Sequence, residues 1–440
     1  MDLIQQAKSS VDQAELFTIH RKSAHIRFSS GSLDLVAHRN NSACALRVLK
    51  NGKLGASYGE SASQEGLLDD AMAAAAFGQA TNFGFATDLP TPTSPGYNGR
   101  TAALSAEDLV EVCSDVKSRI AQAAPDAPIN MVCQAESGQR VLETSEGVAA
   151  EEAYSRTELS VEVPFPSQGT MIGAAARIIS NNPIEVTDEW IDSLLEMRSW
   201  GEQVSAPSSG RLPAILTPYT SRLLTLSLAA CLSGSAVCKG VSALADSVGE
   251  QVLSSQLTIR EDAMYSGHPH ARSFDDEGVA CQPRTLIERG VLRGFLTDLS
   301  SAADLGQPST GNALRRTMFS EKIEDVPTAS WLGAIIDPGD VSWRELIAGI
   351  DEGILVTRMS GLHSSNLLQG QFSVQASGFH IRRGKAVGYL EKTMMAGNIF
   401  EDFCNIGAIS QEREYTAQEA MGVAGLAPYI LLNSVQVTVG

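Results

Sequence analysis

The sequence of 440 residues lacks any apolar run long enough to cross a membrane. Its most apolar stretch, residues 223–238, is shorter than the ~20 residues of a spanning helix and contains several Ser and Thr residues. We therefore predict a buried core helix there and no membrane association. Residues 1–6 show no basic segment followed by an apolar run, so we also expect no secretory signal.

Positive charge is scarce, because 33 Lys and Arg residues stand against 51 Asp and Glu residues, giving a formal net charge of -18. Proteins that bind nucleic acids need clustered cations to displace counterions from the phosphates. The longest basic clusters here are the pairs Arg315-Arg316 and Arg382-Arg383, which we expect to be solvated surface. The sequence therefore predicts no direct contact with nucleic acid.

Cysteine and histidine are also few, with seven of each. The cysteines are scattered without a CxxC pair, which is typical of reduced, buried thiols in a cytoplasmic protein. No histidine lies between His38 and His268, and no HExxH motif occurs. The GxSxG, GxGxxG and P-loop motifs are absent, so those routes to acyl transfer and nucleotide binding have no support.

The remaining composition is that of a globular protein, and the length suits two or three domains. We predict an N-terminal α+β unit at residues 1–88, with strand-like runs at 16–28 and 33–38. Asn51-Gly52 separates two alternating apolar segments and indicates a hairpin with a type I′ turn. Residues 89–104 begin with a segment rich in proline and glycine and are predicted to be a linker.

Two helix starts are marked in residues 105–206, which we predict to be a middle α+β segment that packs with the N-terminal unit. Ser105 precedes Asp108, and Thr187 precedes two acidic residues, as at capped helix N-termini. Residues 211–440 contain mostly strand patterns, with turns at Gly290 and Gly384 and short helices. The predicted fold class is α+β, with an N-terminal helix–sheet domain and a C-terminal antiparallel β domain.

One cluster has the composition of a metal site. His268 and His270 are followed by Asp275, Asp276 and Glu277, and imidazole with carboxylate suits zinc or manganese. A flanking glycine and an intervening proline favour a solvated loop instead, and we prefer that interpretation.

Residues 274–279, FDDEGV, are followed by TLIERGVLRGFL at 285–296 and STGN at 309–312. This order resembles the TldD/PmbA family, also known as the modulator of DNA gyrase family. Matching segments at 246–253, 353–357, 370–379 and 396–399 extend the resemblance over about residues 240–410. The resemblance implies that the C-terminal β domain with its short helices is barrel-like.

The same resemblance implies a two-subunit peptidase. In this family the TldD subunit carries a helical HExxxH motif and a distant cysteine that bind zinc, which activates water for peptide hydrolysis. The TldE/PmbA-type subunit lacks these ligands and assembles with TldD. The family is associated with unfolded or extended peptides and with the maturation of peptide precursors.

This sequence departs from the catalytic pattern. The helix that would carry HExxxH contains no histidine, and the motif would fall near Thr225, Leu226 and Ala230. No cysteine lies in residues 420–426, where the distant zinc ligand is expected. The resemblance therefore implies no catalytic residue and no metal ligand in this chain, with zinc held by a partner subunit.

The expected partners are a TldD-type catalytic subunit or a second copy of this chain in a homodimer, and an extended peptide as substrate. Asp275, Asp276, Glu277 and Gly278 are candidates for contacting that peptide, although carboxylates in this pattern more often hold backbone turns. Two other functions stay open. In the first, the chain is an autonomous homodimeric hydrolase that uses His268, His270 and the nearby acidic residues. In the second, it is a non-enzymatic protein that acts on a partner such as gyrase.

Overall fold

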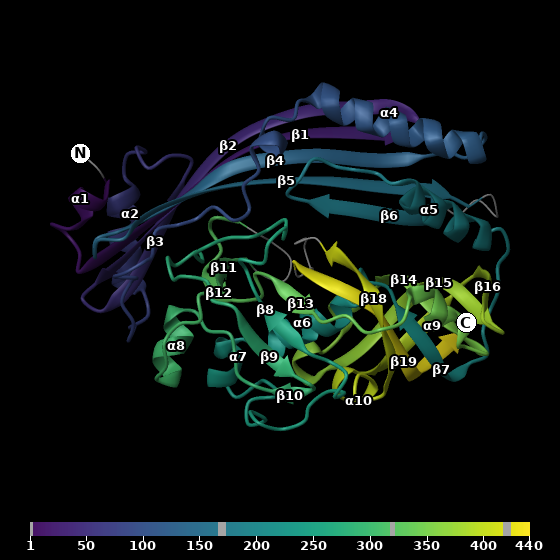
Figure 1. The fold of residues 1–440 in the computed structure, drawn as a ribbon. Helices are drawn as coiled ribbons and strands as arrows, with labels where there is room; N and C mark the ends of the chain where they lie inside the picture. The colour runs from purple at the N-terminus through teal and green to yellow at the C-terminus, as the bar shows by residue number, and fades with distance from the viewer. Residues whose placement is uncertain (1–2, 166–172, 317–321, 417–423) are drawn as a thin grey trace.

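The protein is described by a computed structural model that covers residues 3–165, 173–316, 322–416 and 424–440. A long curved sheet from the N-terminal half arches over a β-rich C-terminal body (Figure 1). The predicted α+β fold is confirmed. No helix in the described part of the chain is both long enough and apolar enough to cross a membrane.

The N-terminal sheet has six strands in the order β3-β2-β1-β4-β5-β6, and all neighbouring strands are antiparallel. Asn51 and Gly52 connect β2 to β3 with φ values of 53° and 68°, as the predicted hairpin turn requires. The run at 33–38 is the first part of one longer strand, β2. The strands are β1 Gln13–Ser29, β2 Ser32–Lys50, β3 Lys53–Gly59, β4 Asn130–Thr144, β5 Ala149–Pro164 and β6 Gly173–Ser180.

The predicted helix caps are confirmed. Ser105 and Asp108 form a capping box at the start of α4, and the Thr187 hydroxyl accepts the backbone N–H of Trp190 at the start of α5. Helix α4 lies on the outer, convex side of the sheet (Figure 1). The helices of this half are α1 Leu3–Ala7, α2 Leu67–Phe77, α3 Gly99–Ala102, α4 Ala106–Ala123 and α5 Asp188–Trp200.

The two faces of the long strands differ in chemistry, because successive side chains point to opposite sides. On β1, Leu16 and Ile26 belong to apolar clusters that include side chains of the α2 and α4 helices. Glu15, Phe17 and Arg21 occupy the alternate positions, and they contact or line spaces shared with the C-terminal body. The inner face of the sheet is therefore a charged surface placed against a second protein layer.

Residues 1–88 and 105–206 contribute strands to this one sheet, since β1 pairs with β4 along its length. Residues 89–104 contain α3 and run along β5, where the Ser155 hydroxyl donates to the carbonyl of Asn98. The second sheet begins at Gly210.

The C-terminal body contains an eleven-stranded sheet in which β7, β14, β15, β17 and β19 form a closed ring, because β19 pairs with both β17 and β7. Most pairs are antiparallel, but β13–β19 and β14–β7 are parallel. The strands of this sheet are β7 Gly210–Leu216, β8 Ile259–Glu261, β9 Arg284–Glu288, β10 Val291–Leu292, β13 Ala334–Ile336, β14 Glu352–Ser360, β15 Gln371–Arg382, β16 Lys385–Tyr389, β17 Thr393–Asn398, β18 Ile406–Thr416 and β19 Gly425–Val439. Two further strands, β11 Ala313–Arg315 and β12 Pro327–Ala329, form a separate two-stranded sheet.

The helices of this body are short, as expected. They are α6 Arg222–Cys231, α7 Gly234–Cys238, α8 Leu299–Leu305, α9 Trp343–Ala348 and α10 Ile399–Asp402, with single 3-10 turns η1 Leu362–Ser364 and η2 Leu367–Gln369. The predicted turns at Gly290 and Gly384 connect β9 to β10 and β15 to β16, and both glycines have positive φ. The main apolar cluster of the body lies inside the ring and around α6.

Candidate functional site between the two sheets

Helix α6 occupies the position where the resemblance places a zinc motif. Thr225 and Leu226 are buried, Ala230 is partly buried, and the helix packs in the main apolar cluster. None of these three side chains offers an imidazole, thiolate or carboxylate, which are the groups that bind zinc in proteins. The residues at this position therefore do not fit a zinc ion. The distant zinc cysteine of the family is expected in residues 420–426, and positions 420–423 of that segment lie outside the described residues.

The FDDEGV segment forms a tight turn between the sheet and the C-terminal body. Asp275 accepts the backbone N–H groups of Glu277, Val279 and Ala313 at 2.8 to 3.0 Å. Gly278 has a φ of 76°, and a Cβ atom added there would lie 2.6 Å from the Leu142 side chain on β4. The turn is thus shaped by carboxylate-to-backbone bonds and by close packing on the sheet.

Glu277 enters a buried network of charged side chains that joins the two halves. Arg47 on β2 lies 2.6 Å from Glu15 on β1 and 2.9 Å from Glu277, and Arg315 lies 3.2 Å from Glu15. Glu277 also accepts the backbone N–H of Leu299 at 2.7 Å, at the first residue of α8. All four charged side chains are almost fully buried, so each depends on the others for compensation.

The pKa values of the three acids differ because their partners differ. Burial, followed by the charge of Glu277, raises the pKa of Asp275 to about 8. Burial also raises the pKa of Glu277 to about 7, against the charge of Arg47. Burial acts in the same direction on Asp276, but Arg272 and Arg315 hold the pKa of that carboxyl below its usual range. Asp276 is thus the acid whose charge the surroundings favour most.

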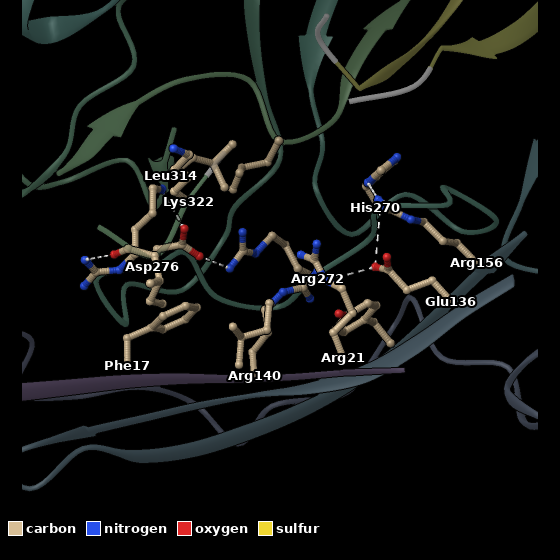
Figure 2. A pocket seen from close by; sticks show the side chains of 15 residues that line it. Phe17, Arg21, Glu136, Arg140, Arg156, His270, Arg272, Asp276, Leu314 and Lys322 are labelled. Carbon is tan, nitrogen blue, oxygen red and sulfur yellow. Dashed lines mark hydrogen bonds and ion pairs between the residues drawn. The ribbon is translucent and has the colours of Figure 1, made fainter. Parts of the chain in front are cut away.

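A cavity of about 80 Å³ lies beside this network, between the inner face of the sheet and the C-terminal body. In Figure 2, Phe17, Arg21, Glu136 and Arg140 project from the strands toward side chains of the opposite layer. The opposite wall includes His270, Arg272, Asp276 and Leu314 (Figure 2). Of the four residues predicted to contact a peptide, only Asp276 lines this cavity, while Asp275, Glu277 and Gly278 form the turn behind it.

The expectation that His268 and His270 lie in a solvated loop is wrong, because their exposed fractions are 0 % and 9 %. The His268 Nδ1 atom accepts the backbone N–H of His270, and the His270 Nδ1 atom lies 2.9 Å from an Arg156 nitrogen. Burial lowers the pKa of His268 to about 4. A histidine that faces a guanidinium group is poorly placed to bind a cation as well.

The expectation of solvated surface also fails for Arg315, which is 3 % exposed, although Arg382 and Arg383 are exposed as predicted. Outside residues 1–2, 166–172, 317–321 and 417–423, no three His, Cys, Asp or Glu side chains are grouped so as to hold a metal ion. His380 is buried, and its Nδ1 atom lies 2.7 Å from the hydroxyl oxygen of Ser205.

Sequence reasoning missed most residues of this site, above all the arginines of the inner sheet face. Arg140 lies 3.0 Å from Glu152, whose other oxygen accepts from the backbone and hydroxyl of Ser273. One signal was available, because Glu15 and Arg47 are direct cross-strand partners and each stands between two apolar neighbours in the sequence. A buried charge at such a position predicts an opposite charge beside it.

Comparisons with known proteins agree with this architecture. A family model described as the PmbA/TldA metallopeptidase C-terminal domain matches residues 209–439, and the model for domain 1 matches residues 14–77. The metalloprotease PmbA of Escherichia coli O157:H7 is 23 % identical over 434 residues, which are 93 % of this chain and 90 % of that protein. A metalloprotease of Methanothermobacter thermautotrophicus is 27 % identical over 48 % of this chain, and the match spans only 45 % of that relative.

Solved structures show the same fold over the whole chain. TldE from Thermococcus kodakarensis superposes with a TM-score of 0.88 at 22 % identity, covering 100 % of this chain and 99 % of that one. A putative modulator of DNA gyrase from Thermotoga maritima gives a TM-score of 0.82 at 20 % identity, with coverage of 99 % and 98 %. The C-terminal family model covers more than half of the 440 residues, and the chain therefore belongs to the PmbA/TldD metallopeptidase family.

Proposed function

We propose that this chain is the non-catalytic, TldE/PmbA-like subunit of a cytoplasmic TldD-type zinc metallopeptidase that acts on unfolded or precursor peptides. The observation that carries the proposal is the chemistry of α6, whose sequence RLLTLSLAAC has no histidine or carboxylate. Peptide hydrolysis needs an activated nucleophile and stabilisation of the oxyanion, and a metal-bound water supplies the former. In this proposal the partner subunit supplies both the activated nucleophile and the stabilisation of the oxyanion.

The architecture supports a role in holding an extended peptide. The sheet that arches over the C-terminal body ends in the edge strands β3 and β6, and edge strands carry backbone groups that can pair with an added strand. Backbone pairing depends little on side-chain identity, which suits substrates that share extended conformation rather than sequence. Binding energy gained on this subunit would orient the scissile bond at the partner's metal.

The first test is metal content. We expect less than stoichiometric zinc in the purified chain after mild dialysis, because α6 has no histidine or carboxylate to bind it. Elemental analysis of the chain and of its HExxxH-bearing partner, prepared in the same way, provides the comparison. One tightly held zinc per chain would contradict the proposal and favour the autonomous hydrolase.

The second test is activity by reconstitution. We expect no cleavage of an extended peptide by this chain alone, cleavage by the mixture with the partner, and loss of cleavage when the partner's motif glutamate is changed to Gln. Activity of this chain alone would support the autonomous hydrolase. Full activity of the partner alone would instead leave this chain a non-enzymatic role, such as contact with another protein.

A further inference from the structure

The cavity between the sheet and the C-terminal body is lined by far more positive than negative charge. Six cationic side chains face it, together with the carboxylates of Glu136 and Asp276; the cations are Arg21, Arg140, Arg156, Arg272, Arg315 and Lys322. Adding Glu15 and Glu152, which pair with two of these arginines from outside the lining, still leaves six cations against four acids. This surplus occurs in a chain whose net charge is -18, so it is a local arrangement.

The surplus is concentrated at one end of the cavity. Glu136 lies 3.5 Å from Arg21 and 3.3 Å from Arg156, so a single carboxylate stands opposite two guanidinium groups. Both distances exceed the roughly 2.7–2.9 Å of a good charge-assisted hydrogen bond. Arg156 also donates toward the neutral ring of His270, which provides a hydrogen-bond acceptor but no negative charge.

Neighbouring groups respond to this positive environment. Burial, and after it the charges of Arg156, His268 and Arg140, lowers the pKa of His270 well below its usual value. Burial and the nearby Arg272 lower the pKa of Arg140 as well. Burial by itself lowers the pKa of a cationic group, and the neighbouring cations add to that effect at both residues.

Apart from Tyr154 and His270, the rest of the lining is apolar, with Phe17, Ile19, Leu314, Ile323 and Leu332 on the walls. A volume of about 80 Å³ is well above the ~10–15 Å³ that one water molecule needs. A bare inorganic anion would contact the guanidinium groups and leave the apolar walls exposed to water. A terminal amino-acid residue, with an α-carboxylate and a small apolar side chain, uses both.

We propose that this cavity binds the C-terminal carboxylate of a peptide, with Arg21 and Arg156 as its principal ligands. Arg21 and Arg156 are the most accessible arginines of the lining, because their side chains are 39 % and 25 % exposed, whereas Arg272 and Arg315 are almost fully buried. Guanidinium groups bind carboxylates through paired N–H donors. The choice of a peptide as the source of the carboxylate rests on the proposed function.

The test is a calorimetric titration of the full chain with N-acetyl-tetraalanine and with the C-terminal amide of the same peptide. We expect the free acid to bind at least tenfold more tightly than the amide. Arg21→Gln and Arg156→Gln should each weaken binding of the acid at least tenfold and leave the amide unchanged. Arg27→Gln is the matched control, since Arg27 lies on the same strand with a 49 % exposed side chain paired to Asp34, away from the cavity.

Equal binding of acid and amide, no binding of either, or equal effects of Arg21→Gln and Arg27→Gln would overturn the proposal. Inorganic phosphate is titrated in parallel, and phosphate that binds as tightly as the acid would assign the cavity to a free oxyanion instead. The titration needs no partner and no catalysis. Binding of the acid by a chain that forms no active peptidase would therefore reject the proposed function and keep the carboxylate site.

Discussion

At the scale of single residues, His268 shows how burial changes acid–base behaviour. Its ring is fully buried against His270 and the edge-on ring of Tyr415, and an ionised imidazole there would lose its hydration. In the unfolded chain a histidine has a pKa near ~6.5. In the folded protein burial lowers the pKa of His268 to about 4. Between these two values only the unfolded state takes up the proton.

The contribution of His268 to the free energy of unfolding should therefore fall by about 2 kcal/mol as pH decreases from about 6.5 to 5. We expect His268→Gln to remove this contribution. Urea unfolding at pH 7 and pH 5 measures it, with exposed His363→Gln as the control. The difference between variant and parent isolates His268, since the buried acids, whose effects have the opposite sign, are common to both. An unchanged slope would contradict the depressed pKa.

Part of the site was predictable from the sequence. The FDDEGV motif predicted the turn at Asp275–Gly278. The family resemblance predicted the helix at the position of α6 and the absence of histidine from it. The paired arginines were not predictable in the same way, because Arg47 and Glu277 are 230 positions apart and Arg315 and Glu15 are 300 apart. Only the folded arrangement of the sheet over the C-terminal body brings such residues together.

At the scale of elements, the sequence predicted where helices and turns begin and end better than it predicted what each element packs against. The capping residues Ser105 and Thr187 and the Asn51-Gly52 turn all act as expected, since these features depend on hydrogen bonds and dihedral angles within a few residues. The pattern of β1 and β2 predicts alternation but not which layer each face contacts. For that reason the charged inner face of the sheet was missed.

The packing of α2 on β3 gives a test at this scale. A Cβ atom added at Gly55 would lie 2.1 Å from the carbonyl oxygen of Ala71 and 2.4 Å from the backbone nitrogen of Ala75. Gly55→Ala should therefore push the helix from the strand and lower the unfolding free energy by about 2 kcal/mol. Chemical denaturation measures it. Gly294→Ala, where the added atom meets nothing within 4 Å, should change stability little. Similar effects of both substitutions would contradict the close approach.

At the scale of the whole molecule, the buried charges tie the sheet to the C-terminal body. Arg47 belongs to the sheet and Glu277 to the body, while Glu15 and Arg315 form a second link in the same direction. Removing one member of such a network leaves buried charges with less compensation. The two layers should therefore unfold together in the parent protein.

Arg47→Leu should lower the free energy of unfolding by about 3–5 kcal/mol, because Glu15 and Glu277 lose their shared cation. We expect thermal unfolding followed by two spectroscopic probes to change from coincident to separate transitions. Adding Glu277→Gln to Arg47→Leu should recover part of the loss. Arg27→Gln, which breaks an exposed pair, should cost within ~1 kcal/mol. A cost of that size for Arg47→Leu would show that the network contributes little.

The ring of the C-terminal body also sets an order of events during synthesis. Strand β7 begins at Gly210, but its ring neighbour β19 spans Gly425–Val439. The ring cannot close until more than two hundred further residues have left the ribosome, although the whole N-terminal sheet has already emerged. During that interval the inner face, with its arginines and glutamates, meets water rather than protein. An apolar face exposed for this long would promote association with another nascent chain. The charged inner face of the sheet disfavours such association.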